Sequence, residues 1–373
     1  MKKIIVIGAG IIGLSISYYL KKHNFDIAVI EKNKAGIEAS YAAAGMLAAQ
    51  SEFDFYEDFM NFCVKSRDMY EDFCREIEGS SGIKAELTNN GFIIPALTEA
   101  EEDFLKQKYE WQKKKRFDVQ LLDNKELAEL EPNISDNIRL ALHIKNDLQV
   151  NNRKLMEALI ISNKKNGVRI IEDCEVRDYI VKDSKINGTK TNIGNFYADV
   201  VINAAGSWSS LISQGLIPNF RVKPILGQML SLASSKKILE KTIFAIMKGK
   251  GCYIVPRNDN TIVLGSTMED VGFEKRVTDQ GINGILNNAI QIVPKLKNSE
   301  IKEKWAGFRP TTADQFPIIG KTNIENLLLA TAHGRNGILL APITAKAIEE
   351  LVANGNIIPE IKDFGVERFN NKN

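Results

Sequence analysis

A chain of 373 residues, 44% of them hydrophobic, is long enough to bury a sizeable core and to form two or three domains. Its 49 basic and 47 acidic residues leave a net charge of +2, which argues against the strongly basic surfaces that bind nucleic acids or anionic membranes. The four cysteines lack the spacing of a metal site or a disulfide framework, and there are only three histidines. We therefore expect no metal, and a reducing cytoplasm as the compartment.

The first residues predict a dinucleotide-binding β-α-β unit. An apolar run at 4–7 indicates a buried strand, and it leads into Gly8, Gly10 and Gly13 and then into a helical pattern. Gly8 permits a tight turn, Gly10 lets the backbone approach a pyrophosphate, and Gly13 lets the helix pack closely on the strand. The pyrophosphate would then lie on the amides at the start of that helix.

Glu31 supports this interpretation, because it ends the second apolar strand 18 residues after Gly13 and can accept hydrogen bonds from a ribose diol. As an alternative, Lys2 and Lys3 followed by apolar residues to Leu20 could form a signal peptide or membrane anchor. Three glycines interrupt that run and no small-residue cleavage site follows it, so we prefer the dinucleotide fold. No other stretch approaches the eighteen apolar residues that span a bilayer.

The remaining pattern alternates between helical and strand-rich segments. Up to residue 164 it predicts a glycine- and alanine-rich loop before residue 50, a helix at 52–80, a strand at 91–97, surface helices in the highly charged stretch 98–131, and a helix at 151–164 capped near Asn151 or Asn152. Beyond it we expect a β-meander at 168–197, strands at 200–203, 222–232, 244–247, 253–255, 262–264, 305–309 and 327–330, and helices at 278–292 and from Gly337 to about Gly355.

Nucleotide-type segments thus lie at both ends of the chain, with a β-rich module between them. This order suits a large dinucleotide such as FAD held between domains, whereas a nicotinamide dehydrogenase more often keeps its dinucleotide domain contiguous. We predict a two-domain α/β (α+β) fold, with a Rossmann-like FAD-binding domain and an interleaved β-rich substrate domain. The expected FAD-binding segments are 1–82, 143–220 and 311–373, and the substrate-binding segments are 83–142 and 221–310.

Several motifs follow one another in a family-specific order. Besides the N-terminal glycines they are Ser-Tyr-Ala-Ala-Ala-Gly-Met-Leu at 40–47, Ala-Ala-Gly-Ser-Trp-Ser at 204–209, Cys-Tyr-Ile-Val-Pro-Arg at 252–257, Gly-Ser-Thr-Met at 265–268, Trp-Ala-Gly-Phe-Arg-Pro at 305–310, Asp314 with Pro-Ile-Ile-Gly at 317–320, and Ala-His-Gly-Arg-Asn-Gly-Ile-Leu-Leu-Ala-Pro at 332–342. On these residues the chain resembles the FAD-dependent D-amino-acid oxidase superfamily, and within it most closely the bacterial glycine oxidases, over nearly its whole length.

The resemblance implies FAD held without a covalent link. Backbone at 45–47 would approach the flavin ring, the segment 174–176 would pass the adenine, and amides after Gly334 would stabilise negative charge on the reduced ring. Cys252 is the nearest candidate for a covalent link, but we expect it to be structural. The implied cofactor-binding residues are Gly8, Gly10, Ile11, Ile12, Gly13, Glu31, Ala44, Gly45, Met46, Val176, Gly206, Trp208, Gly334, Arg335, Asn336, Gly337, Ile338 and Leu339.

The resemblance also implies which residues meet the substrate. Arg309 presents a fork that can hold a carboxylate bidentately, and the hydroxyl of Tyr253 would bind the same carboxylate. Arg335 would guide or bind the carboxylate, or only shape its loop. Met268 would line the pocket above the ring, unless it packs in the core. His333 could be considered a general base, but its motif favours a place beside the flavin.

The implied reaction is oxidative deamination of glycine or another small amine, with hydride transfer from Cα to the flavin and reoxidation by oxygen to hydrogen peroxide. Gly251 could widen the pocket and Tyr41 could narrow its access, so sarcosine, D-alanine and D-proline stand beside glycine. The leading alternative is a D-amino-acid or imino-acid dehydrogenase that passes electrons to another acceptor. The resemblance further implies a role in thiamine biosynthesis and a homo-oligomer, often a tetramer.

Two further classes of protein fit the sequence less well. A flavin-binding module without turnover, acting as a tRNA-modification partner or scaffold, is disfavoured by the substrate-type residues Arg309, Tyr253 and Arg335 and by the lack of a basic stripe. An NAD enzyme would be colourless, whereas a flavoprotein would be yellow. We therefore expect a small amino acid and molecular oxygen as partners, with neither nucleic acid nor membrane.

Overall fold

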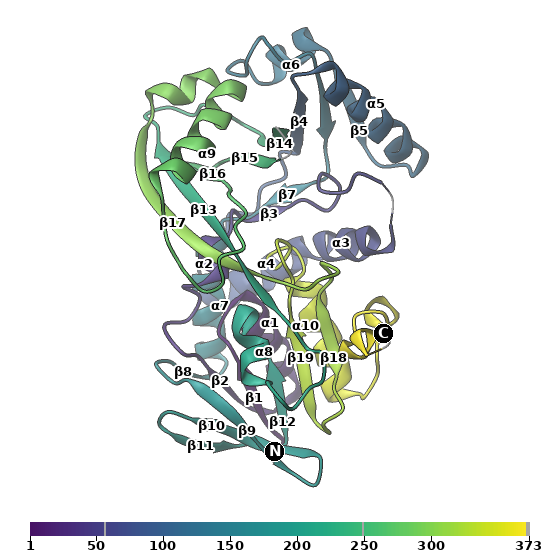
Figure 1. Cartoon of the computed structure of the whole chain (residues 1–373), viewed down its shortest axis with the longest axis vertical. Helices are drawn as coiled ribbons and strands as arrows, with labels where there is room; N and C mark the ends of the chain where they lie inside the picture. Colours follow the sequence, from purple (N-terminus) through teal and green to yellow (C-terminus); the bar gives the residue numbers. More distant parts are fainter. Residues whose placement is uncertain (56, 248–249, 371–373) are drawn as a thin grey trace.

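The N-terminal apolar strand lies inside a six-stranded sheet in the computed structural model, which describes residues 1–55, 57–247 and 250–370 (Figure 1). The sheet has the order β18-β19-β12-β1-β2-β8, and all neighbours are parallel except β18 and β19. Its strands are β1 (Lys3–Ile7), β2 (Asp26–Ile30), β8 (Arg169–Ile171), β12 (Val200–Asn203), β18 (Ile318–Lys321) and β19 (Leu327–Thr331).

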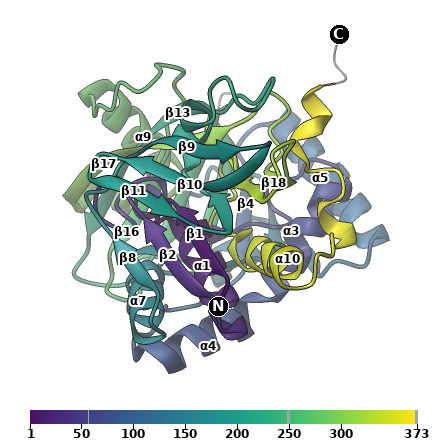
Figure 2. The same ribbon diagram turned by 90° about the horizontal axis from the view of Figure 1, so that it is seen from below.

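Both faces of this sheet are covered, which explains why its strands are apolar at successive positions. Ile4 and Val6 of β1 point into a core formed with the helices α1 (Ile11–Leu20), α7 (Asn152–Lys165) and α10 (Ala341–Ala353). Ile5 and Ile7 point into a second core on the opposite face. That face is covered by the antiparallel meander of β9 (Val176–Lys182), β10 (Lys185–Thr191) and β11 (Gly194–Tyr197), seen in front of the sheet in Figure 2.

A second, eight-stranded sheet has the order β17-β13-β16-β15-β14-β4-β6-β5. Its two longest strands, β13 and β17, are paired antiparallel and reach down toward the six-stranded sheet in Figure 1. The strands are β4 (Phe92–Ala96), β5 (Val119–Leu122), β6 (Leu140–Ile144), β13 (Lys223–Ala233), β14 (Thr242–Met247), β15 (Lys250–Pro256), β16 (Ile262–Gly265) and β17 (Glu300–Thr311).

One face of the eight-stranded sheet is closed by the helix α9 (Asp279–Ile292). Cys252 and Ile254 of β15 join the core beneath α9, whereas Tyr253 and Val255 alternate to the other face. The sheet therefore keeps one face for packing and leaves the other for a cavity.

Shorter elements connect the two sheets. A small pair of strands, β3 (Met46–Leu47) and β7 (Leu148–Gln149), lies between them (Figure 1). The other helices are α2 (Ala39–Ala42), α3 (Asp58–Asp68), α4 (Tyr70–Ser81), α5 (Glu99–Lys114), α6 (Asn124–Leu130) and α8 (Ser209–Ile212), with 3-10 turns η1 (Lys21–His23), η2 (Gly206–Trp208), η3 (Pro294–Asn298), η4 (Pro359–Ile361) and η5 (Val366–Phe369). Within the described ranges, no helix is both long and apolar enough to cross a bilayer.

The predicted fold class, a mixed α/β architecture with a Rossmann-like sheet, is confirmed. The two sheets draw their strands from interleaved segments of the chain, as the predicted order requires. The exact domain boundaries stay a prediction, and β6 runs two residues past the expected boundary at 142. Asn151 caps α7 by accepting a hydrogen bond from the Lys154 amide, which settles the choice between Asn151 and Asn152.

Two helix predictions are wrong in part. The stretch 52–80 forms two helices that meet at Met69, and the first begins only at Asp58. The buried carboxylate of Asp147 accepts hydrogen bonds from the amides of Gln50 and Ser51, which holds the preceding segment as a turn. The charged stretch 98–131 contains β5 between its two helices, because pairing with β6 at the sheet edge prevails over local helix preference.

Two other boundaries also differ from the sequence pattern. Within the expected meander of 168–197, β8 instead joins the six-stranded sheet beside β2. The last helix begins at Ala341 rather than Gly337, because Pro342 has no amide hydrogen and is tolerated only in the first turn. Its end at Ala353, just before Asn354 and Gly355, is as predicted.

The packing of α1 on β1 can be tested at Gly13. A Cβ atom at this position would lie 2.0 Å from the carbonyl oxygen of Gly8. We expect Gly13→Ala to lower the free energy of unfolding by about 1–3 kcal/mol, because either the helix or the turn must move. The measurement is urea unfolding of the purified protein, with FAD content recorded in parallel.

Gly79 in α4 is the matched control, because a Cβ atom there would meet no atom within 4 Å. Gly79→Ala should raise the free energy of unfolding by about 0.5–1 kcal/mol through helix propensity. Equal free energies for the two variants would contradict close packing at Gly13.

Candidate active site

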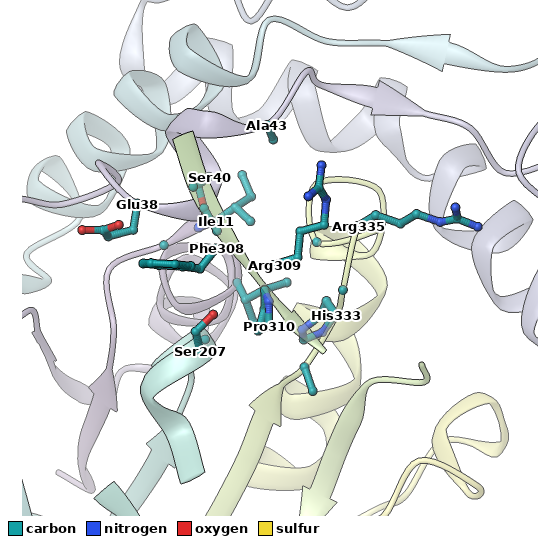
Figure 3. Close-up of a pocket in the computed structure, with 18 of the residues that line it drawn as sticks. Ile11, Glu38, Ser40, Ala43, Ser207, Phe308, Arg309, Pro310, His333 and Arg335 are labelled. Atoms are coloured by element: carbon teal, nitrogen blue, oxygen red, sulfur yellow. Dashed lines mark hydrogen bonds between the residues drawn. The ribbon is translucent and has the colours of Figure 1, made fainter. Parts of the chain in front are cut away.

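One large cavity of about 1190 Å³ is lined by both sheets. It begins at the carboxyl ends of β1 and β2, where Gly8 and Glu31 stand, and it extends to Met229 and Tyr253 of the eight-stranded sheet. The carboxyl ends of parallel strands are the usual place for a ligand in an open α/β sheet. Figure 3 shows that side chains from the α2 region, η2, β17 and the loop after β19 gather around this space.

The first βα turn has the features of a dinucleotide cradle. Gly8 adopts a φ of 100°, and a Cβ atom there would lie 2.6 Å from the carbonyl oxygen of Ala204. Gly10 begins α1 without a side-chain cap. The carboxylate of Glu31 accepts hydrogen bonds from the amides of Ala9 at 2.8 Å and Asn33 at 3.0 Å. Burial raises the pKa of Glu31, and these two bonds oppose that rise.

A buried hydroxyl provides an independent test of whether this cradle fits FAD. The Oγ atom of Ser207 lines the cavity and has no hydrogen-bond partner in the described part of the chain. A buried hydroxyl without a partner is unfavourable, so its position fits a polar ligand that completes the bond. The Ile11 amide at the start of α1 already donates to the Ser40 hydroxyl, so the following amides of α1, the Ser207 hydroxyl and Glu31 are the groups that suit a dinucleotide.

The part of the cavity wall that is expected to approach the flavin ring consists largely of backbone. Gly45 has a φ of 71°, and a Cβ atom there would lie 2.0 Å from the carbonyl oxygen of Val150. Arg257, just after β15, donates to the carbonyl oxygens of Ala44 at 2.7 Å and Val150 at 3.0 Å. Burial lowers the pKa of Arg257 to about 10. This arginine therefore ties the eight-stranded sheet to the ring-side wall through carbonyl oxygens.

Arg309 lies at the substrate end of the cavity, near the end of β17. Its guanidinium donates to the hydroxyl of Ser266 at 2.5 Å and to the carbonyl oxygen of Thr267 at 3.2 Å. Gly227 on the paired strand β13 makes room for it, since a Cβ atom there would lie 2.2 Å from Nη1. No carboxylate of the described residues forms an ion pair with Arg309, so its charge is available to a ligand.

Tyr253 lies beside Arg309 and faces the same cavity. Its hydroxyl donates to the sulfur of Met229 at 2.9 Å, a weak acceptor that a carboxylate can replace. Burial raises the pKa of Tyr253 and Arg309 opposes that rise, so the phenol keeps its proton at neutral pH. Its cross-strand neighbour Gly265 leaves space for the ring, because a Cβ atom there would lie 2.5 Å from it.

Arg335 and Met268 also line the cavity, as predicted, and both differ from Arg309 in their surroundings. Nε of Arg335 lies 2.7 Å from Oε2 of Glu52, so its charge already has a partner. In Figure 3 the side chains of Arg335 and Arg309 extend in different directions. Met268 is 72% exposed, which excludes the alternative of core packing.

His333 lies in the cavity wall as a buried, neutral side chain. Its Nε2 lies 3.0 Å from the hydroxyl of Thr344 on α10, and burial lowers its pKa to about 3. A histidine with so low a pKa is a weak base at neutral pH. We therefore keep the prediction that His333 has a structural place beside the cofactor and is not a general base.

Most of the predicted cofactor residues line the cavity, and two do not. Gly13 acts through packing against Gly8, and Leu339 is buried in the core, where its carbonyl oxygen accepts a hydrogen bond from Ser66. The predicted residues that line it are Gly8, Gly10, Ile11, Ile12, Glu31, Ala44, Gly45, Met46, Val176, Gly206, Trp208, Gly334, Arg335, Asn336, Gly337 and Ile338.

The structure places Gly251 and Tyr41, the two residues expected to change the width of the pocket, in different surroundings. Gly251 lines the cavity, and a Cβ atom there would meet no other atom within 4 Å, so this position leaves the cavity open. Tyr41 does not line the cavity, and the expectation that it narrows the access is wrong. Its ring lies against the guanidinium of Arg153, 3.7 Å from the ring centre, and its hydroxyl donates to Glu303.

Comparison with known proteins agrees with this geometry. The model of the family described as "FAD dependent oxidoreductase" matches residues 3–351. The chain belongs to this family of FAD-dependent oxidoreductases. The expected resemblance, the enzyme class and FAD as the cofactor are therefore confirmed, and the NAD enzyme is excluded.

Curated relatives of this oxidoreductase carry two kinds of name. The chain is 32% identical to the glycine oxidase of Geobacillus kaustophilus, over 97% of the chain and 96% of that protein. It is 32% identical to the glycine oxidase of Bacillus subtilis, over 95% of this chain and 93% of that protein. It is also 32% identical to the bifunctional protein ThiO/ThiG of Trichormus variabilis, but it spans only 55% of that relative's length.

Solved structures of proteins named glycine oxidase share this fold. The crystal structure of the glycine oxidase from Geobacillus kaustophilus superposes with a TM-score of 0.93 at 31% identity, covering 99% of each chain. That of the glycine oxidase from Bacillus cereus superposes with a TM-score of 0.90 at 29% identity, covering 95% of this chain and 96% of the other.

Glu52 lines the cavity of this oxidoreductase but could not be recognised from the sequence. It lay within a stretch predicted to be helical, where a single acidic residue has no distinguishing pattern. In the structure it is placed by a turn whose course depends on Asp147, almost a hundred residues away in the chain. Gly227 was also missed, because its role depends on a cross-strand neighbour. Contacts of this kind leave no local signal in a sequence.

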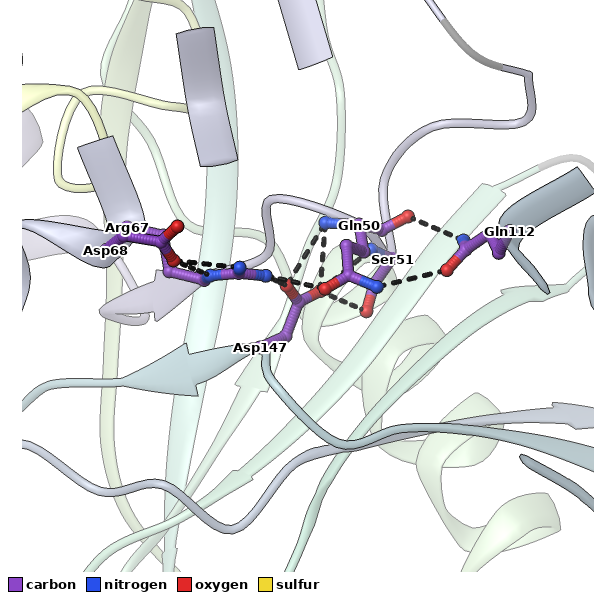
Figure 4. A network of polar contacts seen from close by, with 6 residues as sticks. All are labelled: Gln50, Ser51, Arg67, Asp68, Gln112 and Asp147. Carbon is purple, nitrogen blue, oxygen red and sulfur yellow. Dashed lines mark hydrogen bonds and ion pairs between the residues drawn. The ribbon is translucent and has the colours of Figure 1, made fainter. Parts of the chain in front are cut away.

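A buried polar network holds this turn in place (Figure 4). Asp147 accepts hydrogen bonds from the amides of Gln50 and Ser51 and from the Ser51 hydroxyl, the last at 2.7 Å. Arg67 of α3 lies 3.3 Å from the same carboxylate. Lys108 of α5 donates to the carbonyl oxygen of Ser51 at 2.7 Å, and burial lowers its pKa to about 8. The wall beside the cavity is thus fixed from three sides.

Replacement of Asp147 tests this support. Asp147→Asn keeps the shape but replaces one of the two accepting oxygens by an NH2 group, which would face a donor, and it leaves Arg67 without its buried counter-charge. We expect a loss of about 2–4 kcal/mol in the free energy of unfolding, measured by urea titration.

Asp68→Asn is the matched control, because Asp68 pairs with the same arginine but is 61% exposed. Its cost should stay below about 1 kcal/mol. A similar loss in both variants would mean that Asp147 has no special part in holding the turn.

Proposed function

We propose that this oxidoreductase catalyses the oxidative deamination of glycine and other small amines or D-amino acids, among them sarcosine, D-alanine and D-proline. The products would be a 2-oxo acid, ammonia and hydrogen peroxide. The proposal is carried by Arg309, which has no carboxylate partner among the described residues and lies beside a phenol donor in the FAD-type cavity. Relatives named glycine oxidase, 32% identical over most of both chains, support it.

In the proposed complex the substrate carboxylate binds the guanidinium of Arg309 and the hydroxyl of Tyr253. These two donors come from neighbouring parts of one sheet, so they fix the carboxylate and with it the direction of the Cα–H bond. Bound FAD would supply the acceptor for the hydride from Cα and a route for two electrons to oxygen, and water would hydrolyse the imine product. Since hydride departs with its electron pair, no strong base has to remove the Cα proton.

A second candidate shares the first half of this reaction. A D-amino-acid or imino-acid dehydrogenase would use the same carboxylate site but would deliver the electrons to an acceptor other than oxygen. The exposed Met268 at the cavity is compatible with either kind of acceptor. The two candidates differ only in the oxidative half-reaction, which is where a test must separate them.

The wider setting of the enzyme is part of the same proposal. We propose a part in thiamine biosynthesis, which relatives named ThiO/ThiG support although this chain spans only 55% of their length, and a homo-oligomer, which the family resemblance implies. The four cysteines, all buried and unpaired, suit the reducing cytoplasm proposed for the protein.

The first test is anaerobic mixing of the FAD-loaded protein with glycine, sarcosine, D-alanine or D-proline, with the flavin absorbance near 450 nm as the readout. We expect bleaching by at least one of them, then rapid recovery with hydrogen peroxide when air is admitted. Bleaching with slow recovery would favour the dehydrogenase. Absence of bleaching by all four compounds would contradict the proposed substrate class.

The role of Arg309 can be tested by Arg309→Leu. Losing a bidentate, charge-assisted contact should lower kcat/KM for the best substrate at least about 100-fold, while the FAD content stays near that of the unaltered protein. Arg139→Leu is the control, because Arg139 is exposed and pairs with Glu102 away from the cavity. Its kcat/KM should stay within about twofold. Normal turnover of Arg309→Leu at low substrate concentration would contradict the proposed pose.

A further inference from the structure

We infer that Glu52 determines specificity in this cavity, by neutralising Arg335 and so restricting the site to ligands that carry a single carboxylate. This inference rests on the proposed function for its substrates, but its central claim concerns charge. The cavity holds two arginines at its substrate end, Arg309 and Arg335. Without Glu52, two guanidinium groups would suit a dicarboxylate.

The two arginines differ in the groups that balance their positive charge. Within the described part of the chain, Arg309 donates to a hydroxyl and a carbonyl oxygen and forms no ion pair with a carboxylate, so its charge is available to the ligand. Arg335 has Oε2 of Glu52 at 2.7 Å from its Nε. The three charged groups sum to one positive charge, which a single carboxylate balances. A ligand with two carboxylates would leave one negative charge that these three groups do not balance.

Glu52 cannot easily turn away from this position. Its side chain is only 6% exposed, and the turn before it is fixed by Asp147 and Lys108. The Oε2 atom lies at ion-pair distance from Arg335 without the alignment of a hydrogen bond, and among the described residues this buried oxygen has no hydrogen-bond donor. A second carboxylate approaching Arg335 would meet that oxygen and be repelled.

Other carboxylates reinforce this barrier. Asp54 and Glu57 line the same cavity from the segment that follows Glu52. Asp54 lies 3.7 Å from Lys108, which compensates part of its charge. Because Glu52 is the most buried of the three and the one that contacts Arg335, its removal should have the largest effect.

The test compares sarcosine with iminodiacetate, a secondary amine that differs by one added carboxylate. The ratio of kcat/KM for iminodiacetate to that for sarcosine is measured in the FAD-loaded protein and in Glu52→Gln and Glu52→Asp. Glu52→Gln should raise this ratio at least about tenfold, and Glu52→Asp, which keeps the charge, should raise it far less. Adding Arg335→Leu to Glu52→Gln should abolish the gain.

The same ratio in all three proteins would overturn the inference, and would leave the Glu52–Arg335 pair a structural contact. A gain that survives Arg335→Leu would also overturn it, because the added carboxylate would then bind elsewhere. FAD content and thermal unfolding of each variant separate these outcomes from misfolding.

A binding experiment keeps this inference apart from the proposed function. Acetate and malonate, which have one and two carboxylates and no amine, are titrated into each protein while the flavin spectrum is followed. The unaltered protein should bind malonate at least about tenfold more weakly than acetate, and Glu52→Gln should remove that difference. If this holds but no amine bleaches the flavin, the proposed function fails and the inference stands. If amines are oxidised and malonate binds as well as acetate to the unaltered protein, the inference fails alone.

Discussion

The site depends on close approach of backbone segments where the two sheets meet, because a dinucleotide and a substrate leave no room for side chains there. Gly8 lies against the chain at Ala204, and Gly45 lies against Val150. At the substrate end, Gly227 makes room for the guanidinium of Arg309. At each of these positions a Cβ atom would come within 2.6 Å of another atom, so a larger residue would displace a wall or a functional group. The same glycines explain why the two sheets can share one cavity.

The two ends of this cavity present different charged groups. The dinucleotide end offers the N-terminus of α1, whose N-cap residue is Gly10, and the Glu31 carboxylate. The substrate end offers one uncompensated cation, Arg309, and one compensated pair, Glu52 and Arg335. Because Arg335 already has a carboxylate partner and Arg309 has none among the described residues, two arginines in the same cavity can have different roles.

Support for the substrate end comes from outside the cavity. Asp147, Arg67 and Lys108 reach the turn at 50–52 from three different elements, and none of them is among the residues that line the cavity. On the opposite side, Arg257 holds the ring-side wall through carbonyl oxygens. Walls fixed in this way keep donors in place before a ligand arrives, which is what orientation of a small substrate requires.

The sequence by itself determined the strand–glycine–helix unit, the alternation of helical and β-rich segments, and the presence of Arg309 and Tyr253 in ordered motifs. These features depend on local periodicity and on residues a few positions apart, so a single chain records them. Three other features are fixed only by tertiary packing: the turn at 50–52, the contact of Glu52 with Arg335, and the packing of Tyr41 on Arg153 outside the cavity lining. Each of these outcomes depends on a partner far away in the chain, and burial and pairing between such partners are set only when the sheets pack together.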